Sequence, residues 1–237
     1  MFLALSPEKP ALLGDSNPEL VNLYGVVRDH PRALMQALDV LRSLYSEEFY
    51  YLVRSRPEED PIERAARTVF LNKCGFNGLY RVNSKDKFNV PFGKRARCPA
   101  LYHVENLLAA SARFQRATLV HSDFESVLAQ AGAGDFVYCD PPYEPISRTA
   151  AFTSYIPGGF SQTDQARLQI ACRGAADRGA AVAISNSNAP FIVSLYAEWS
   201  QQPILARRAV NVKGDGRGEV TELLLMRNIA LPATQIA

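Results

Sequence analysis

A carboxylate, two prolines and a tyrosine follow directly after a short run of β-favouring residues. The run spans residues 136–139 and leads into Asp140, Pro141, Pro142 and Tyr143. Because proline donates no backbone hydrogen bond and disfavours helical angles in the preceding residue, we expect a buried strand that ends in a stiff loop. Such a loop offers a carboxylate, two proline carbonyls with no neighbouring N–H group to occupy them, and an aromatic face. These groups suit a flat heterocycle with an exocyclic amine.

This loop resembles the catalytic motif of the amino-methylating DNA methyltransferases, in which Asp, Asn or Ser precedes Pro-Pro and an aromatic residue. RNA and protein-glutamine methyltransferases carry an Asn-Pro-Pro-Tyr version, and an ordinary turn is the structural alternative. The resemblance implies Asp140, Pro141, Pro142 and Tyr143 as catalytic residues, and S-adenosylmethionine as a cofactor that Asp140 also contacts. The base must leave the duplex to reach such a loop. In the mechanism that we infer, the Asp140 carboxylate and the Pro141 carbonyl accept hydrogen bonds from adenine N6, Tyr143 stacks on the ring, and the methyl group transfers directly.

Residues 72–94 alternate along two arms around a polar tip, which is typical of a hairpin. The runs NKCGFNGLYRVN (72–83) and FNVPFG (88–93) resemble the DNA-recognition hairpin of the D12-class, GATC-type adenine methyltransferases. Leu79, Arg81 and Pro91 match positions that contact bases in that family, whereas a structural hairpin with solvated charges is the alternative. GATC is the target implied, although relatives with other targets share the pattern. The DNA-binding candidates in this stretch are Lys73, Asn77, Leu79, Arg81, Asn83, Asn89, Pro91 and Lys94.

Two further acids stand at the ends of expected strands. Residues 11–15 end in Asp15, a candidate for the ribose hydroxyls of the cofactor; a turn or helix cap is the alternative. Residues 117–121 form the next expected strand, and the resemblance implies that Asp123 and Phe124 contact the adenine ring of the cofactor. Asp123 can also cap a helix that begins at Glu125.

The family carries a glycine-rich turn after the first strand, preceded by a Lys-containing Gly-Gly segment, and neither occurs here. The sequence as given is therefore expected to lack an N-terminal cofactor segment. A non-catalytic DNA-binding remnant is one alternative hypothesis. A methyltransferase that acts on RNA or protein glutamine is another.

The remaining pattern predicts an α/β fold. We expect a Rossmann-like, mostly parallel sheet whose last strand is antiparallel, with an inserted helical and β-hairpin subdomain for DNA recognition. Three parts are predicted: 1–55, the truncated start of the catalytic domain; 56–100, the insertion with the hairpin 72–94; and 101–237, the rest of the catalytic domain. Expected helices cover 31–56, from Pro61 with Asp60 as cap, 103–114 and 162–178.

The third part of the chain holds three further candidate features. Strand 180–185 ends in Ser185 and Asn186, which resemble a Ser-Asn element beside the active site. Residues 152–155 resemble a segment that closes over the target base. A last hairpin, 204–226, carries Arg207 and Arg217, which are candidates for contact with the DNA backbone.

Bulk composition fits a globular protein. The 237 residues are 47% hydrophobic and 21% charged, with a net charge of +2. No bilayer-spanning run or signal peptide is evident, so a cytoplasmic, nucleoid-associated protein of bacterial or phage origin is expected. The four cysteines show no metal-binding spacing, so we expect no metal site. The expected partner is double-stranded DNA, bound by a monomer, and a role in restriction-modification is one possibility.

Overall fold

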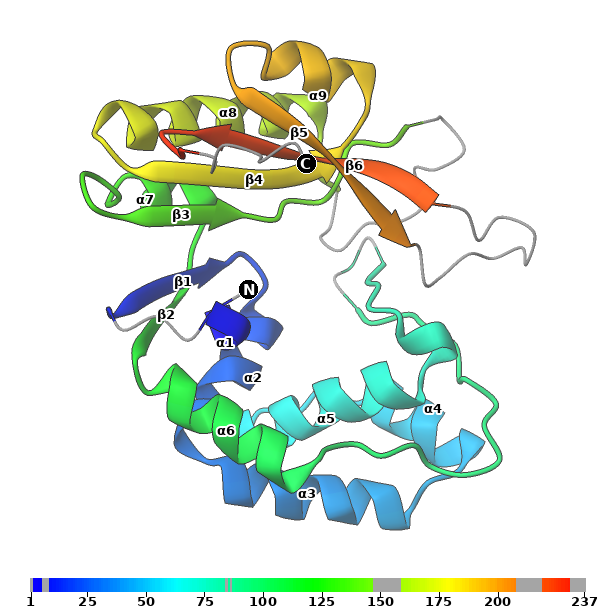
Figure 1. The fold of residues 1–237 in the computed structure, drawn as a ribbon. Helices are drawn as coiled ribbons and strands as arrows, with labels where there is room; N and C mark the ends of the chain where they lie inside the picture. The colour runs from blue at the N-terminus through cyan, green and yellow to red at the C-terminus, as the bar shows by residue number, and fades with distance from the viewer. Residues whose placement is uncertain are drawn as a thin grey trace, which may run out of the picture. The chain divides into compact units, whose positions relative to one another are not determined.

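A computed structural model describes residues 2–5, 9–83, 85, 87–146, 159–207 and 219–230. The chain is a mixed α/β protein that divides into two units, Met1–Asp123 and Phe124–Ala237. Figure 1 shows the elements of each unit. The predicted division at residues 55 and 100 stays a prediction.

The first unit holds one parallel strand pair and a group of helices. Strand β1 pairs with β2 from Ala11 opposite Ala117 to Asp15 opposite His121. Helices α2, α3, α5 and α6 lie together in this unit (Figure 1). The elements are α1 Phe2–Leu5, β1 Ala11–Asp15, α2 Pro18–Asp29, α3 Pro31–Ser43, α4 Glu47–Ser55, α5 Pro61–Cys74, the short 3-10 helix η1 Phe76–Gly78, α6 Val104–Phe114 and β2 Ala117–His121.

The core of the first unit follows the helical spacing of its leucines and aromatic residues. Leu34 and Leu38 of α3 are buried together with Tyr50 of α4 and Phe70 of α5. The stretch 31–56, expected to be helical, is interrupted between α3 and α4, where the Ser46 side chain accepts the Phe49 N–H and so caps α4. A serine cap of this kind contributes about 1 kcal/mol to helix stability.

Helix α5 begins as predicted and ends later than predicted. The Asp60 side chain accepts the backbone N–H groups of Ile62 and Glu63, which confirms the predicted cap. Residues 72–74, predicted to start the hairpin, are instead the last turn of α5, because Leu71 and Cys74 continue its buried face. The helix stops at Gly75, where a Cβ atom would lie 2.6 Å from the carbonyl oxygen of Leu71.

The hairpin therefore runs from Gly75 to Gly93. Isolated antiparallel bridges join Gly75 to Phe92 and Val82 to Phe88. Backbone hydrogen bonds from Asn83 N to Lys87 O and from Asn89 N to Arg81 O link the arms nearer the tip. The antiparallel pairing is confirmed, although the arms are not continuous strands.

The second unit holds a four-stranded sheet in the order β3-β4-β6-β5. Strands β3 and β4 are parallel, and β6 runs antiparallel to both β4 and β5, so the predicted antiparallel ending is confirmed. Helix α8 lies alongside β4 (Figure 1). The elements are α7 Phe124–Leu128, β3 Phe136–Cys139, α8 Gln162–Asp177, β4 Ala181–Ser187, α9 Pro190–Leu195, β5 Ser200–Arg207 and β6 Glu219–Arg227.

The strands of the structure are hydrogen-bonded in two separate sheets, one in each unit. A single Rossmann-like sheet with an inserted subdomain thus stays a prediction. Among the helices that the structure describes, none is long and apolar enough to cross a membrane. The described residues also contain no group of three or more His, Cys, Asp or Glu side chains that could hold a metal ion.

Candidate active site and DNA-binding surface

The loop Asp140–Tyr143 follows β3 immediately, as the sequence predicts. Strand β3 ends at Cys139, and no regular element follows until Gln162 among the described residues. Asp140 is exposed, and Pro141, Pro142 and Tyr143 are half-buried. The loop is therefore accessible, as a role in binding a substrate requires.

The Asp140 carboxylate is oriented by the next strand of the sheet. The Ser185 hydroxyl of β4 donates to Asp140 Oδ1 at 2.6 Å, and the Tyr138 hydroxyl donates to Ser185 Oγ at 3.1 Å. Ser185 has a single proton to donate, and the Asp140 carboxylate at 2.6 Å is a much closer acceptor than the Cys139 carbonyl at 3.5 Å, so the chain of hydrogen bonds ends on the carboxylate. The second carboxylate oxygen, Oδ2, accepts from no donor in the described part of the chain.

The two proline carbonyls of the loop are not equivalent. Gln165 Nε2 donates to the Pro142 carbonyl at 2.9 Å. The expectation that both carbonyls are unoccupied was therefore wrong for Pro142, because it counted only neighbouring backbone N–H groups and missed a side-chain donor from α8. For the Pro141 carbonyl, no donor occurs among the residues that the structure describes.

A buried amide network lies behind the loop. Gln165 Oε1 accepts from Asn186 Nδ2 at 3.1 Å, and Asn186 Oδ1 accepts the Glu144 N–H at 3.1 Å. The Ser187 hydroxyl donates to the Glu144 carbonyl at 2.6 Å. Sequence reasoning missed Gln165. The available signal was a glutamine three residues before Leu168, on the face of α8 that is buried.

Tyr143 has its hydroxyl group near an acid on β6. Its Oη lies 3.4 Å from Glu222 Oε2. Burial, with smaller contributions from the charges of Asp140 and Glu222, raises the pKa of Tyr143 to about 12. The phenol is thus neutral at physiological pH and can act as a stacking surface and hydrogen-bond donor.

Asp15 lies at the carboxyl end of β1 and is half-buried. Its Oδ1 accepts the Asn17 N–H at 2.8 Å. This oxygen therefore stabilises a turn, as the structural alternative for Asp15 predicts. The helix cap is Asn17, whose side chain accepts the Glu19 and Leu20 N–H groups. Burial raises the pKa of Asp15, against the opposing effects of the Asn17 N–H and the His121 charge.

The pairing of β1 with β2 brings the ends of both strands together. Ser122 N donates to Asp15 O at 3.1 Å. Asp123, the next residue after Ser122, therefore lies near the end of β1. Helix α7 begins at Phe124, one residue earlier than expected, which leaves Asp123 immediately before it. The Phe124 ring lies 5.9 Å from that of Phe160, and the Arg167 guanidinium lies 5.0 Å from its centroid.

The hairpin separates its side chains into two sets. Val82, Val90 and Phe92 are buried, whereas Arg81 and Pro91 are exposed. The Arg81 guanidinium reaches across the arms, where Nε donates to Asn89 Oδ1 at 2.7 Å. The other exposed candidates are Lys73, Asn77, Asn83 and Lys94, and the half-buried ones are Leu79 and Asn89.

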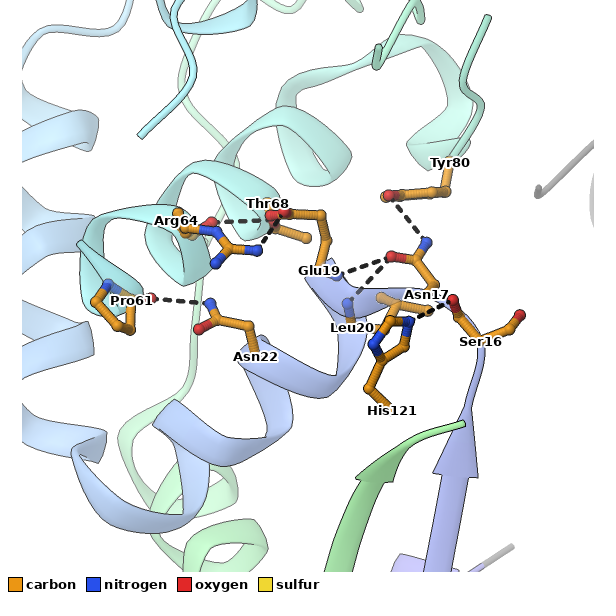
Figure 2. A network of polar contacts seen from close by, with 10 residues as sticks. All are labelled: Ser16, Asn17, Glu19, Leu20, Asn22, Pro61, Arg64, Thr68, Tyr80 and His121. Atoms are coloured by element: carbon orange, nitrogen blue, oxygen red, sulfur yellow. Dashed lines mark hydrogen bonds and ion pairs between the residues drawn. The ribbon is translucent and has the colours of Figure 1, made fainter. Parts of the chain in front are cut away.

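Figure 2 shows how the hairpin and helix α5 are connected to helix α2. Asn17 Nδ2 donates to the Tyr80 hydroxyl at 3.0 Å. Arg64 of α5 forms an ion pair with Glu19 of α2 at 2.6 Å. The residue that caps α2 therefore also contacts the arm that carries Leu79 and Arg81.

Three sets of candidates cannot be placed. Arg217 and residues 152–155 lie outside the described residues. Arg207 is the last residue of β5, and its side chain is not among those described.

Comparison with known proteins gives this arrangement a family. The family model "D12 class N6 adenine-specific DNA methyltransferase" matches residues 1–210. The chain belongs to this family, which confirms the resemblance.

Three curated relatives are similar over nearly the whole chain. "Type II methyltransferase M1.LlaDCHI" of Lactococcus lactis subsp. cremoris is 38% identical, over 95% of this chain and 81% of its own. "DNA adenine methylase" of Vibrio cholerae is 36% identical, over 91% of this chain and 79% of its own. "DNA adenine methylase" of Escherichia coli K12 is 33% identical, over 91% of this chain and 78% of its own.

Proposed function

We propose that this protein transfers a methyl group from S-adenosylmethionine to N6 of an adenine that is flipped out of duplex DNA, with GATC as the first target to test. The observation that carries the proposal is the accessible Asp140 carboxylate, which has one oxygen fixed by Ser185 at 2.6 Å. Family membership supports DNA adenine methylation. The arrangement of the loop residues suggests which role each of them has in methyl transfer.

Asp140 Oδ2 and the Pro141 carbonyl serve as the two acceptors for the N–H bonds of the adenine amine. Accepting both protons keeps the nitrogen lone pair available for the methyl group. The carboxylate needs no rearrangement when the base arrives, because Ser185 already fixes its orientation. Pro142 supports the loop through Gln165 and does not contact the amine, which refines its predicted catalytic role. Tyr143 stacks on the base while its hydroxyl stays near Glu222.

S-adenosylmethionine fits the acids at the end of the first parallel strand pair. The cofactor supplies an electrophilic methyl group on its sulfonium. Asp15 retains Oδ2 for ribose hydroxyls, since the Asn17 N–H occupies Oδ1. Asp123 and Phe124 are proposed to contact the cofactor's adenine ring, and Asp140 to lie beside the reacting end.

DNA contacts are proposed for the hairpin. Arg81 and Asn89 can read base edges together with Leu79, Pro91 and Asn77. Phosphates are the proposed targets of Lys73, Lys94 and Asn83, and of Arg207 and Arg217 further along the chain.

An Asp140→Ala variant tests the proposal. Methyl transfer from radiolabelled S-adenosylmethionine to a GATC duplex should fall by about 100-fold or more, because the variant has no positioned acceptor at the reacting amine. Affinity for the duplex, measured by fluorescence anisotropy, should stay close to that of the wild type, since the proposed base and phosphate contacts of the hairpin are unchanged.

Asp177→Ala is the matched control, because it removes a surface acid from the same unit and should retain wild-type activity. An Asp140→Ala protein with normal turnover would remove this residue from the mechanism. Methyl transfer by the wild-type protein to RNA or to a glutamine-containing peptide, but not to duplex DNA, would replace the proposed substrate.

A further inference from the structure

We propose that Gln165 is a positioning residue for the catalytic loop. Its side-chain amide determines which of the two proline carbonyls remains available to the substrate amine. The inference rests on the proposed function of Asp140 and Pro141, and extends it to a residue of α8 that does not contact substrate.

Gln165 is fully buried, with 0% of its surface exposed. A buried amide is costly unless both of its polar ends are hydrogen-bonded, and here both are. Nε2 donates to the Pro142 carbonyl at 2.9 Å, and Oε1 accepts from Asn186 Nδ2 at 3.1 Å. A burial requirement alone would favour an apolar residue at this position.

The second buried amide, that of Asn186, also has hydrogen-bond partners at both of its polar ends. Asn186 is also 0% exposed. Its Oδ1 accepts two backbone N–H groups, from Glu144 at 3.1 Å and from Ser187 at 2.8 Å. The two amides therefore form a directed chain from β4 through α8 to Pro142, and a second contact reaches the loop at Glu144.

The consequence for the loop is geometric. Ser185 holds Asp140 at its start, Gln165 holds Pro142, and Asn186 and Ser187 hold Glu144 at its end. Because the Pro142 carbonyl is bound to α8, it is directed toward the protein. The Pro141 carbonyl is then the one left to act beside the Asp140 carboxylate. Without Gln165, the carbonyl of the half-buried Pro142 would lose its only donor among the described residues, and the loop would have to rearrange to solvate it.

A Gln165→Glu substitution provides a sharp test, because the new side chain has nearly the same shape and its donor depends on pH. A protonated carboxyl group can donate to the Pro142 carbonyl and accept from Asn186, as the native amide does. The ionised group has no proton to donate and places negative charge beside the carbonyl oxygen. Burial raises the pKa of such a carboxyl, so the change should occur within an accessible pH range.

The measurement is the single-turnover rate of methyl transfer to a GATC duplex, at saturating cofactor and DNA, between pH 5.5 and 8.5. The ratio of variant to wild-type rates should fall from within about threefold at the acid end to about one tenth or less at the alkaline end. Dividing the variant rate by the wild-type rate cancels the pH dependence that comes from ionisable groups present in both proteins. Around Gln165 these groups are Asp140, Tyr143, Glu144, Asp164, Arg167 and Glu222.

A second readout does not depend on activity. The Glu144 amide is bound by Asn186, so its hydrogen exchange, followed by NMR, should accelerate in Gln165→Glu relative to wild type at alkaline pH and not at acid pH. Gln165→Met should show slowed transfer with no dependence of the ratio on pH, because it can neither donate nor ionise.

Gln169→Glu is the matched control. Gln169 lies one turn further along α8 and is also buried, at 6% exposure, but makes no hydrogen bond to the loop among the described residues. It introduces the same buried carboxyl group, so any effect of reduced stability appears in both variants. Its rate ratio should not depend on pH.

A flat rate ratio for Gln165→Glu, or an equal change in Gln169→Glu, overturns the positioning role. A wild-type protein that fails to methylate the duplex would instead contradict the proposed function. In that case, the exchange of the Glu144 amide still decides whether Gln165 holds the loop.

Discussion

Asp15 is the last residue of β1 and Asp140 follows β3 directly, but the two carboxylates have different surroundings. The Asp140 side chain is exposed and accepts one hydrogen bond from Ser185. Asp15 is half-buried, and burial raises the pKa of its carboxyl above the ordinary value of 3.8. A charged group kept in an unfavourable environment is typical of a functional site, because its ligand can supply the missing hydrogen bonds.

The raised pKa of Asp15 leads to opposite expectations for stability and for binding. The folded state holds the Asp15 proton more tightly than the unfolded state does, so this group lowers stability as the pH rises through its folded pKa. Asp15→Asn should therefore raise the Tm at pH 7, since the neutral amide still accepts the Asn17 N–H. It should also weaken the binding of S-adenosylhomocysteine by about tenfold, because hydrogen bonds to a charged acceptor are stronger.

Calorimetry across a pH series checks both expectations for Asp15. Wild-type affinity should fall on acidification, beginning above the ordinary pKa of aspartate, whereas the affinity of Asp15→Asn should stay level. An unchanged affinity in the variant at pH 7 would exclude Asp15 from the cofactor site.

At the scale of elements, the hairpin is held by its buried side chains and leaves the others available. Val82, Val90 and Phe92 are buried, and Phe92 is part of the hydrophobic core of the first unit. The Tyr50 hydroxyl and Arg54 of α4 both donate to the Val90 carbonyl at 3.0 Å, which fixes the second arm to the helical scaffold. Arg81 is braced by Asn89 on the opposite arm. The exposed face is therefore preorganised for a partner.

Arg81→Ala should relax sequence preference at a single base pair. Removal of one good hydrogen-bonded pair with a base costs about 1–3 kcal/mol, so the affinity ratio between a GATC duplex and one changed at that position should fall by roughly 5- to 150-fold. Anisotropy titrations against all single substitutions of GATC identify the position. Arg113→Ala, on the exposed surface of α6, removes the same charge and should preserve the ratio at every position. An equal reduction in affinity for all sequences in Arg81→Ala would show that this residue binds a phosphate.

Elements with strong local signals could be predicted from the sequence. The cap at Asp60 and the strand before Asp140 were evident from residue types alone. The boundary between α5 and the hairpin was not, because Cys74 suits a buried helix and a hairpin arm equally well. Its position depends on the room that Gly75 leaves for the carbonyl of Leu71.

At the scale of the whole chain, contacts between distant residues were beyond prediction. The Gln165 hydrogen bond to Pro142 joins residues 23 apart in sequence, and the Asn17 hydrogen bond to Tyr80 joins residues 63 apart. Motifs indicate which residues do chemistry, since that depends on residue type. They do not indicate which buried amide orients them, because this depends on how helices and strands pack.

The net charge of the chain is only +2, so attraction to DNA must come from local clusters of cations. Lys85 and Lys87 are exposed near the hairpin tip. Replacing both with alanine should reduce the slope of log K against log salt concentration by about 0.9 for each phosphate that the protein no longer neutralises. Sequence preference should persist, because lysines on phosphates carry no base information.

The matched control for the lysine pair is Arg32→Ala with Arg42→Ala, two exposed arginines of α3. Both double variants lower the net charge equally. If binding depends on where the charge lies, only the hairpin pair reduces the salt slope, since counterions are released by cations that touch the phosphates. Equal reductions in the two variants would show that long-range attraction to the whole molecule governs binding, and that the tip of the hairpin does not touch the DNA backbone.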